Sequence, residues 1–320
     1  MNDQLISRIL IATDFSECAR RAVEYGLCVA RAWSARVDLL HVVEVLRGVE
    51  LDVPSADPVL ELRRKEAERL LGDVAIRVKR EGLGVEWYLR EGIPSEQIGQ
   101  ATREQRADLV VVGTYGRTGL EHIMLGSTTE RVIKQAPCPV LTVRGSRRSG
   151  EKDTEAPPCI QHILVPVDFS SPSLDALEYA IQVVDRFGAR LSLLHVLEPI
   201  YHDLELGLGR IEQEVQKRTH SEAQLDGLAQ LVKDRGLAAG SVVLGGIPSE
   251  SIVTHARGQG CDLIVMGTHG RRGLTRLRYG SVAESVLRQA PCPVLTVRTP
   301  KFSPDHRRMM PLTMPESSLA

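Results

Sequence analysis

Short apolar runs alternate along the chain with longer segments of mixed polarity. In the first half the runs cover residues 8–12, 37–43, 85–89, 109–112 and 140–143. Mainly apolar runs of this length are typical of strands buried on both faces of a parallel sheet. The segments between them are long enough for the crossover helices that parallel neighbouring strands require. The pattern therefore predicts a doubly wound α/β fold.

Helix signals fall between these runs. Ser16 stands at the N-cap position of a first helix, whose apolar residues recur at helical spacing at Ala19, Ala22, Val23, Leu27 and Ala30. A second amphipathic helix is expected over Glu61–Arg80, and its inward positions are Leu62, Leu70, Leu71, Val74 and Val78. Pro94 favours the first turn of a third helix.

The sequence repeats itself at a constant offset of 154 residues. Ile9–Ser16 is answered by Ile163–Ser170, so that Asp14 corresponds to Asp168. Further segments repeat at the same offset: Leu40–Glu44 with Leu194–Glu198, Gly92–Glu96 with Gly246–Glu250, and Ala136–Val140 with Ala290–Val294. A repeat of this length is a duplicated domain, so each copy is expected to fold around its own core.

Two tandem domains follow from the repeat. We expect a first domain over residues 1–145, a linker over 146–159, a second domain over 160–299 and a disordered tail over 300–320. The linker is polar and charged and ends near two prolines, while the tail has little periodic apolar content. A chain of 320 residues is also too long for one average domain.

Composition and charge restrict the classes of function. The chain has 40 lysines and arginines, 41 aspartates and glutamates, a formal charge of -1 and 4% aromatic residues. This balance argues against nucleic acid as a partner. No apolar run is long enough to span a bilayer and no leader pattern is present, so no membrane contact is expected. Six cysteines without a C-x-x-C pair fit a cytoplasmic protein better than a disulfide framework or a zinc ribbon.

The candidate chemistry lies in a glycine-rich segment after the fourth strand of each copy. The two segments share one spacing, at Gly113, Gly116, Gly126 and Ser127 and at Gly267, Gly270, Gly280 and Ser281. Glycines let a phosphate approach the backbone, and free amides at the start of the following helix attract an anion. Alternatively, Gly113 and Gly267 only end the strands, and the serines cap the helix instead of donating to a phosphate. The segment matches neither a Walker loop nor the dinucleotide fingerprint.

Two further residue pairs have alternative roles. Asp14 and Asp168 follow the first strand of each copy, where a carboxylate can accept hydrogen bonds from ribose hydroxyls or serve a turn. His41 and His195 have no partner at catalytic or ligand spacing, so a structural role is favoured. No paired carboxylates or activated nucleophile can be assigned, and we therefore predict no catalytic residue.

Together, Ile9–Ser16, Leu40–Glu44, Gly92–Glu96 and the glycine segment that ends in Ser127 resemble the universal stress protein family in its tandem form. The resemblance covers both copies and leaves out the linker and the tail. It implies, for each domain, a Rossmann-like five-stranded parallel sheet of the adenine nucleotide alpha hydrolase-like type, with strand order 3-2-1-4-5. It also implies an internal pseudo-dimer in which the domains pair through their last strands, and a homodimer is left open.

The resemblance further implies ATP as the bound cofactor, with Mg²⁺ or Mn²⁺ on its phosphates as an option and no metal site built by the protein. In the first copy the implied binding residues are Ala12, Thr13, Asp14 and Val42 near adenine and ribose, and Val112, Gly113, Gly116, Arg117, Gly126, Ser127 and Thr128 near the phosphates. In the second copy they are Pro166, Val167, Asp168, Val196, Met266, Gly267, Gly270, Arg271, Gly280, Ser281 and Val282.

The two copies differ at this site. Ala12 departs from the proline that the family often has and that Pro166 retains. Arginines accumulate only in the second glycine segment, at Arg271, Arg272, Arg276 and Arg278. We therefore expect tighter triphosphate binding in the second domain.

The sequence thus predicts an ATP-binding regulatory protein of the stress response, with adenine nucleotide and unidentified proteins as its partners. Two alternatives stay open. One is a slow ATPase or self-phosphorylating enzyme, with Ser127 or Ser281 near the γ-phosphate. The other is an interaction scaffold that binds no nucleotide.

Overall fold

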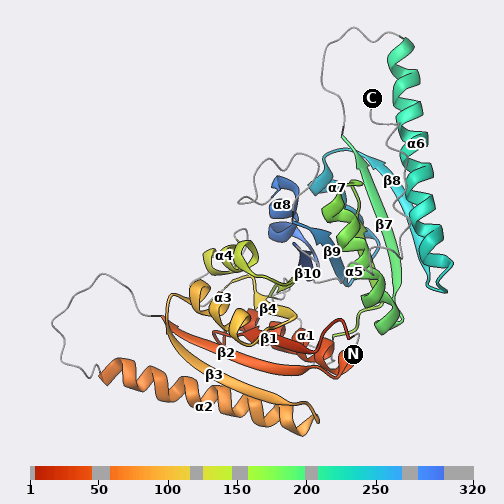
Figure 1. The fold of residues 1–320 in the computed structure, drawn as a ribbon. Coiled ribbons are helices and arrows are strands. Elements are labelled where there is room, and N and C mark those ends of the chain that lie inside the picture. The colour runs from red at the N-terminus through yellow and green to blue at the C-terminus, as the bar shows by residue number, and fades with distance from the viewer. Residues whose placement is uncertain are drawn as a thin grey trace.

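Strands and helices alternate in the same order in both halves of the chain (Figure 1). The structure, a computed structural model, describes residues 4–44, 58–115, 125–145, 158–198, 208–268 and 280–298. Most of the expected linker and the whole of the expected tail lie outside the described residues.

The elements of the first half agree with the predicted strands to within a few residues at their ends. They are β1 (Arg8–Ala12), α1 (Glu17–Trp33), β2 (Arg36–Glu44), α2 (Pro58–Arg80), β3 (Val85–Gly92), α3 (Pro94–Glu104), β4 (Leu109–Gly113), α4 (Ser127–Gln135) and β5 (Val140–Val143). The predicted cap is confirmed, because the Ser16 hydroxyl oxygen accepts a hydrogen bond from the Ala19 amide at 3.2 Å. Pro94 begins α3, also as predicted.

The second half repeats these elements. They are β6 (His162–Pro166), α5 (Ser171–Phe187), β7 (Arg190–Leu197), α6 (Leu208–Lys233), β8 (Ala239–Gly245), α7 (Pro248–Gly258), β9 (Leu263–Gly267), α8 (Ser281–Gln289) and β10 (Val294–Val297).

The ten strands of the described residues form one sheet, in the order β3-β2-β1-β4-β5-β10-β9-β6-β7-β8. Each half therefore has the predicted order 3-2-1-4-5, and neighbours within a half are parallel. The two five-stranded sheets are not separate, because β5 and β10 pair antiparallel, with Val140 opposite Thr296 and Thr142 opposite Val294. The halves thus meet through their last strands, as the resemblance implied.

One cluster of buried apolar side chains covers each face of the sheet. The first cluster packs under α1, α2, α5 and α6, and the second under α3, α4, α7 and α8. Both clusters contain residues from both halves, so the separate cores expected for the two copies are joined. Of the inward positions predicted for α2, Leu71 and Val78 are buried, but Leu62 is 69% exposed. Leu62 is therefore not an inward position, and that prediction was wrong.

Side chains reinforce the junction between the halves in pairs. The Thr142 hydroxyl donates to the Val294 carbonyl at 3.0 Å, and the Thr296 hydroxyl donates to the Val140 carbonyl at 3.2 Å. Arg144 donates to carbonyl oxygens at the C-terminal end of α8, and its counterpart Arg298 does the same for α4. These contacts satisfy helix-end carbonyls that have no partner within the helix.

Glycine at the end of β9 is required by close packing. A Cβ atom at Gly267 would lie 2.7 Å from the Pro172 carbonyl oxygen, which belongs to the backbone of α5. At the equivalent Gly113 it would lie 3.0 Å from the Cys18 sulfur and 3.2 Å from the Ala19 nitrogen. Both glycines therefore let the helix after the first strand approach the end of the fourth strand.

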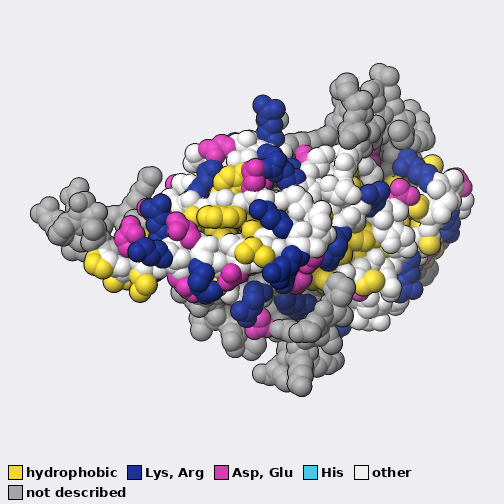
Figure 2. Space-filling view, turned by 90° about the horizontal axis from the view of Figure 1, so that it is seen from below, with side chains coloured by type: hydrophobic (Ala, Val, Ile, Leu, Met, Phe, Trp, Pro, Cys, Tyr) yellow, Lys and Arg dark blue, Asp and Glu magenta, His cyan; other side chains and the backbone are white. Residues whose placement is uncertain are grey.

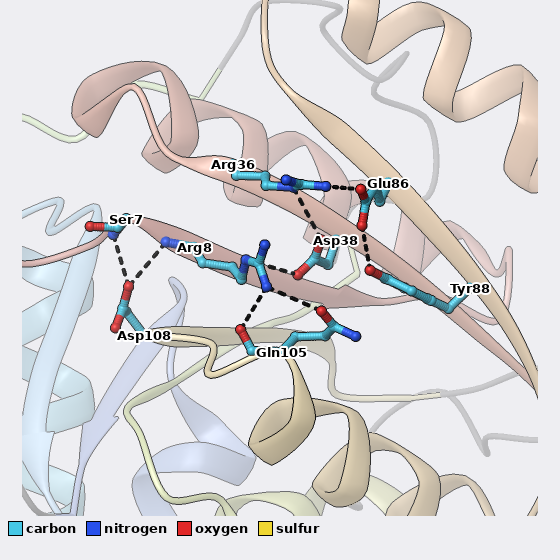
Figure 3. Close-up of polar contacts among 8 residues, drawn as sticks. All are labelled: Ser7, Arg8, Arg36, Asp38, Glu86, Tyr88, Gln105 and Asp108. Atoms are coloured by element: carbon cyan, nitrogen blue, oxygen red, sulfur yellow. Dashed lines mark hydrogen bonds and ion pairs between the residues drawn. The ribbon is translucent and has the colours of Figure 1, made fainter.

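The first half contains a buried carboxylate without a counterpart in the second half (Figure 3). Asp38 on β2 is fully buried, and neither of its oxygens has a hydrogen-bond partner among the described residues. Its ion-pair partners are Arg8, with Nε at 3.5 Å, and Arg36, with Nε at 3.9 Å. Burial raises the pKa of Asp38 more than the two guanidinium groups lower it. The equivalent position in β7 holds the neutral Ser192.

The surface carries both signs of charge. On the face drawn in Figure 2, basic and acidic side chains are interspersed over the described residues. Within the described ranges, no helix is both long enough and apolar enough to cross a bilayer.

We predict that Asp38→Asn makes the stability of the protein less dependent on pH. A carboxyl group whose pKa is raised in the folded state stabilises that state at low pH, and this contribution is lost as the pH rises through the folded pKa. Urea unfolding of both proteins at a series of pH values should show the variant gaining stability relative to the native chain from the ordinary carboxyl range upward. A constant difference at all pH values would contradict the prediction.

We predict that Gly267→Ala lowers the free energy of unfolding by about 1–3 kcal/mol, because the added methyl group must displace backbone. The matched control is Gly72→Ala in the interior of α2, where a Cβ atom would meet nothing within 4 Å. That change should raise the free energy of unfolding by roughly 1 kcal/mol through helix propensity. Chemical denaturation of the two variants measures both effects, and equal effects of one sign would refute the packing argument.

Candidate functional site

The candidate site lies where the strand order reverses. β1 pairs with β2 on one side and with β4 on the other. α1, which follows β1, covers one face of the sheet, whereas α4, which follows β4, covers the opposite face. The chain therefore leaves the two strand ends in opposite directions and opens a crevice at their carboxyl ends, the usual ligand position in such folds.

A cavity of about 910 Å³ occupies this position in the first half. All the described residues that the sequence singled out in the first copy line it: Ala12, Thr13, Asp14, Val42, Val112, Gly113, Gly126, Ser127 and Thr128. Gly116 and Arg117 lie outside the described residues. The structure thus gathers at one place residues that are more than 100 positions apart in the chain.

Asp14 shapes the turn that follows β1. Its Oδ1 atom accepts hydrogen bonds from the Ser16 amide at 3.1 Å and from the Ser16 hydroxyl at 2.6 Å. The turn places Phe15 in the left-handed region, at a φ of 63°, which is unusual for a residue with a side chain. The carboxylate therefore has the structural role that the sequence left open, and it also lines the cavity.

The histidines support the same turns. His41 Nδ1 donates to the Thr13 carbonyl oxygen at 2.7 Å, and its ring lies against Phe15 with centroids 4.6 Å apart. In the second half His195 Nδ1 donates to the Val167 carbonyl at 2.7 Å and lies against Phe169. These contacts are the structural role that the sequence favoured.

The helix after the glycine segment begins without a side-chain cap. Gly126 is the N-cap residue of α4, and Gly280 is that of α8. Ser127 and Ser281 are the first helical residues, so neither serine caps its helix as one alternative required. The uncapped first turn of α4, at Ser127, faces the cavity and carries the partial positive charge of a helix start.

The described candidates of the second copy occupy equivalent positions. Pro166 ends β6, Met266 and Gly267 end β9, and Ser281 begins α8. The remaining described candidates lie beside them: Val167, Asp168, Val196, Gly280 and Val282. Asp168 again accepts a hydrogen bond from the serine two residues on, at 3.1 Å. Gly270, Arg271 and the three arginines that follow lie outside the described residues.

One wall of the first cavity was missed by the sequence reasoning. The start of α2 contributes Leu62, Arg63, Glu66, Ala67 and Leu70. In the second copy, at the same offset, α6 has the polar residues Gln216, Lys217, His220, Ser221 and Gln224. The sequence did contain a signal for this wall: Leu62 is apolar, whereas the equivalent position in the second copy is polar.

Tyr115 is a second lining residue that was not among the predicted binding residues. It lines the cavity, and its hydroxyl oxygen accepts a hydrogen bond from Arg144 Nη2 at 2.6 Å. Arg144 also binds the end of α8, so the cavity wall is tied to the other half of the molecule. No cluster of histidine, cysteine and carboxylate side chains suited to a metal ion occurs among the described residues.

Comparison with known proteins identifies the family. The family model described as "Universal stress protein family" matches residues 6–144 and again 160–298. A universal stress protein of Mycolicibacterium smegmatis is 27% identical over 295 residues, which cover 91% of this chain and 96% of that protein. A universal stress protein of Methanocaldococcus jannaschii is 35% identical over 147 residues, covering 46% of this chain and 86% of the relative.

The fold agrees with this result. The crystal structure of a universal stress protein from Archaeoglobus fulgidus has a TM-score of 0.69 and 24% sequence identity, and the match covers 93% of this chain and 98% of that one. With both halves matched by the family model, the chain belongs to the universal stress protein family and carries two consecutive copies of its domain.

Proposed function

We propose that this protein binds ATP at the carboxyl ends of its strands and acts as a nucleotide-dependent regulator in the stress response. The observation that carries the proposal is the convergence of Asp14, Val42, Gly126 and Ser127 on one cavity at the point where the strand order reverses. Its volume of about 910 Å³ lies within the range of small-molecule sites.

The lining suits the separate parts of a nucleotide. Ala12 and Val42 offer apolar surface to adenine, and Asp14 offers a carboxylate to the ribose hydroxyls. Gly126 brings the backbone close to the start of α4, where Ser127 and Thr128 present first-turn amides to phosphate. Gly116 and Arg117 would complete this side.

The charge of the lining argues for backbone binding of the phosphates. Among the described lining residues Arg63 is the basic side chain, while Asp14, Glu44 and Glu66 are acidic. Phosphate attraction therefore rests on the helix start and its amides. In this proposal Mg²⁺ or Mn²⁺, where present, is held by the phosphates and neutralises part of their charge.

The second domain provides an equivalent site in this proposal. Asp168, Val196, Gly280 and Ser281 take the roles of their counterparts, and Gly270 and Arg271 those of Gly116 and Arg117. The arginines of its glycine segment remain the reason to expect tighter triphosphate binding there. The domain boundaries at 1–145 and 160–299 likewise remain our proposal.

We predict that blocking one cavity removes one nucleotide per chain. Val42 and Val196 are equivalent, partly buried residues, and arginine at either position would fill the space for the base. Val42→Arg and Val196→Arg should each weaken ATP binding at one site at least tenfold, or about 1.4 kcal/mol, and the double variant should lose both sites. Isothermal titration calorimetry and the nucleotide released on denaturation measure the ratio.

The matched control is Ile76→Arg on α2, an exposed apolar residue that does not line the cavity. It should leave both the binding ratio and the affinity unchanged. Thermal unfolding without nucleotide confirms that the variants are folded, and added ATP should raise the unfolding temperature of the native chain. A native protein that contains no nucleotide and shows no binding would disprove the proposal and favour a nucleotide-free scaffold.

A further inference from the structure

Two of the six cysteines are accessible to solvent, and they are neighbours in space. Cys28 on α1 is half-buried and Cys159, just before β6, is exposed. The other four are buried: Cys18, Cys138, Cys261 and Cys292. An oxidant dissolved in water therefore meets Cys28 and Cys159 first.

The fold brings Cys28 next to the peptide group that precedes Cys159. Cys28 Sγ donates a hydrogen bond to the Pro158 carbonyl oxygen at 3.1 Å. That carbonyl belongs to the peptide group that leads into Cys159, and standard geometry puts the next Cα about 2.8 Å from the oxygen. The Cys28 sulfur is therefore within about 6 Å of the Cys159 Cα atom. A disulfide then requires the Cys159 side chain to turn toward Cys28 and the backbone before β6 to adjust until the geometry of the bond is reached.

The two thiols differ in readiness to react. Burial raises the pKa of the Cys28 thiol, Arg31 lowers it, and charge on the neighbouring Cys159 raises it again, with a net increase. The sulfur of Cys28 is also engaged with the Pro158 carbonyl. Cys159, exposed at the surface, is the thiol that a bulky oxidant can reach.

We propose that Cys28 and Cys159 form a reversible disulfide that ties the first half of the protein to the start of the second under oxidising conditions. The oxidant is a small disulfide such as glutathione disulfide. The Cys159 thiolate attacks one of its sulfurs and releases one glutathione. The Cys28 thiolate then attacks the Cys159 sulfur of the mixed disulfide and releases the second. The protein loses two thiol protons and two electrons, and one glutathione disulfide becomes two glutathione molecules.

The bond would act at a junction that otherwise has no covalent link apart from the chain. α1 and α5 lie in contact there, with the rings of Trp33 and Phe187 in an edge-on arrangement 5.5 Å apart. A bridge from residue 28 to residue 159 closes a loop that contains most of the first domain, which restricts the unfolded chain and stabilises the folded one. The inference does not depend on nucleotide binding.

The test uses the full chain equilibrated with glutathione disulfide and glutathione at several ratios. We expect the thiol count to fall from six to four per chain and peptide mapping without reduction to show Cys28 joined to Cys159 in a monomeric species. The oxidised protein should unfold several degrees higher than the reduced protein, and dithiothreitol should reverse the change.

The matched controls are Cys28→Ser, which keeps a donor for the Pro158 carbonyl, and Cys159→Ser. Neither variant should form the internal bridge or gain stability on oxidation, and Cys28→Ser should stop at the mixed disulfide on Cys159. The proposal is overturned if the native chain also stops at that mixed disulfide, if Cys159 joins a second molecule instead, or if a buried cysteine replaces Cys28 in the bridge.

Discussion

Antiparallel pairing of β5 with β10 joins the halves, and the positions of the other layers depend on it. Without this pairing, β5 and β10 would each form the edge of a parallel sheet, with a row of unpaired backbone groups. The contact between Val140–Thr142 and Val294–Thr296 satisfies these groups. It leaves β3 and β8 as the outer edges and aligns the helices of both halves, so that one apolar cluster runs along each face.

Residues next to the β5–β10 junction also contact the helices that begin at the two candidate sites. α4 and α8 begin at the glycine segments, and their C-terminal ends receive Arg298 and Arg144 from the last strand of the opposite half. Arg144 in addition binds the Tyr115 hydroxyl at the wall of the first cavity. The helix starts that we assign to phosphate are therefore held by elements of both copies.

The duplication provides an internal comparison of how side chains diverge on one backbone. Asp38 lies between Arg8 and Arg36, whereas His162 and Ser192 occupy the places of Arg8 and Asp38 and bond to each other at 2.7 Å. At neutral pH the second arrangement avoids the cost of a buried charge, since burial and Arg190 lower the pKa of His162. The strand positions stay the same because they depend on apolar pattern and pairing.

Local and periodic features were readable from the sequence alone. The 154-residue offset, the strands, the Ser16 cap and the start of α3 at Pro94 follow from short-range rules of pattern and backbone geometry. The family resemblance added two further predictions, the strand order and the residues around the cavity. Those residues lie at strand ends, and the carboxyl ends of parallel strands meet wherever the sheet forms.

Only the tertiary structure decided which distant groups meet. It set the antiparallel register that merges two sheets into one, placed the start of α2 with Leu62 beside the cavity, and brought Cys28 to within one residue of Cys159. It also showed that Gly113 and Gly267 are needed for packing against α1 and α5, a role that any phosphate contact would share. A sequence pattern determines the face on which a side chain lies, but burial, ion pairing and the approach of distant cysteines depend on what the rest of the chain packs against that face.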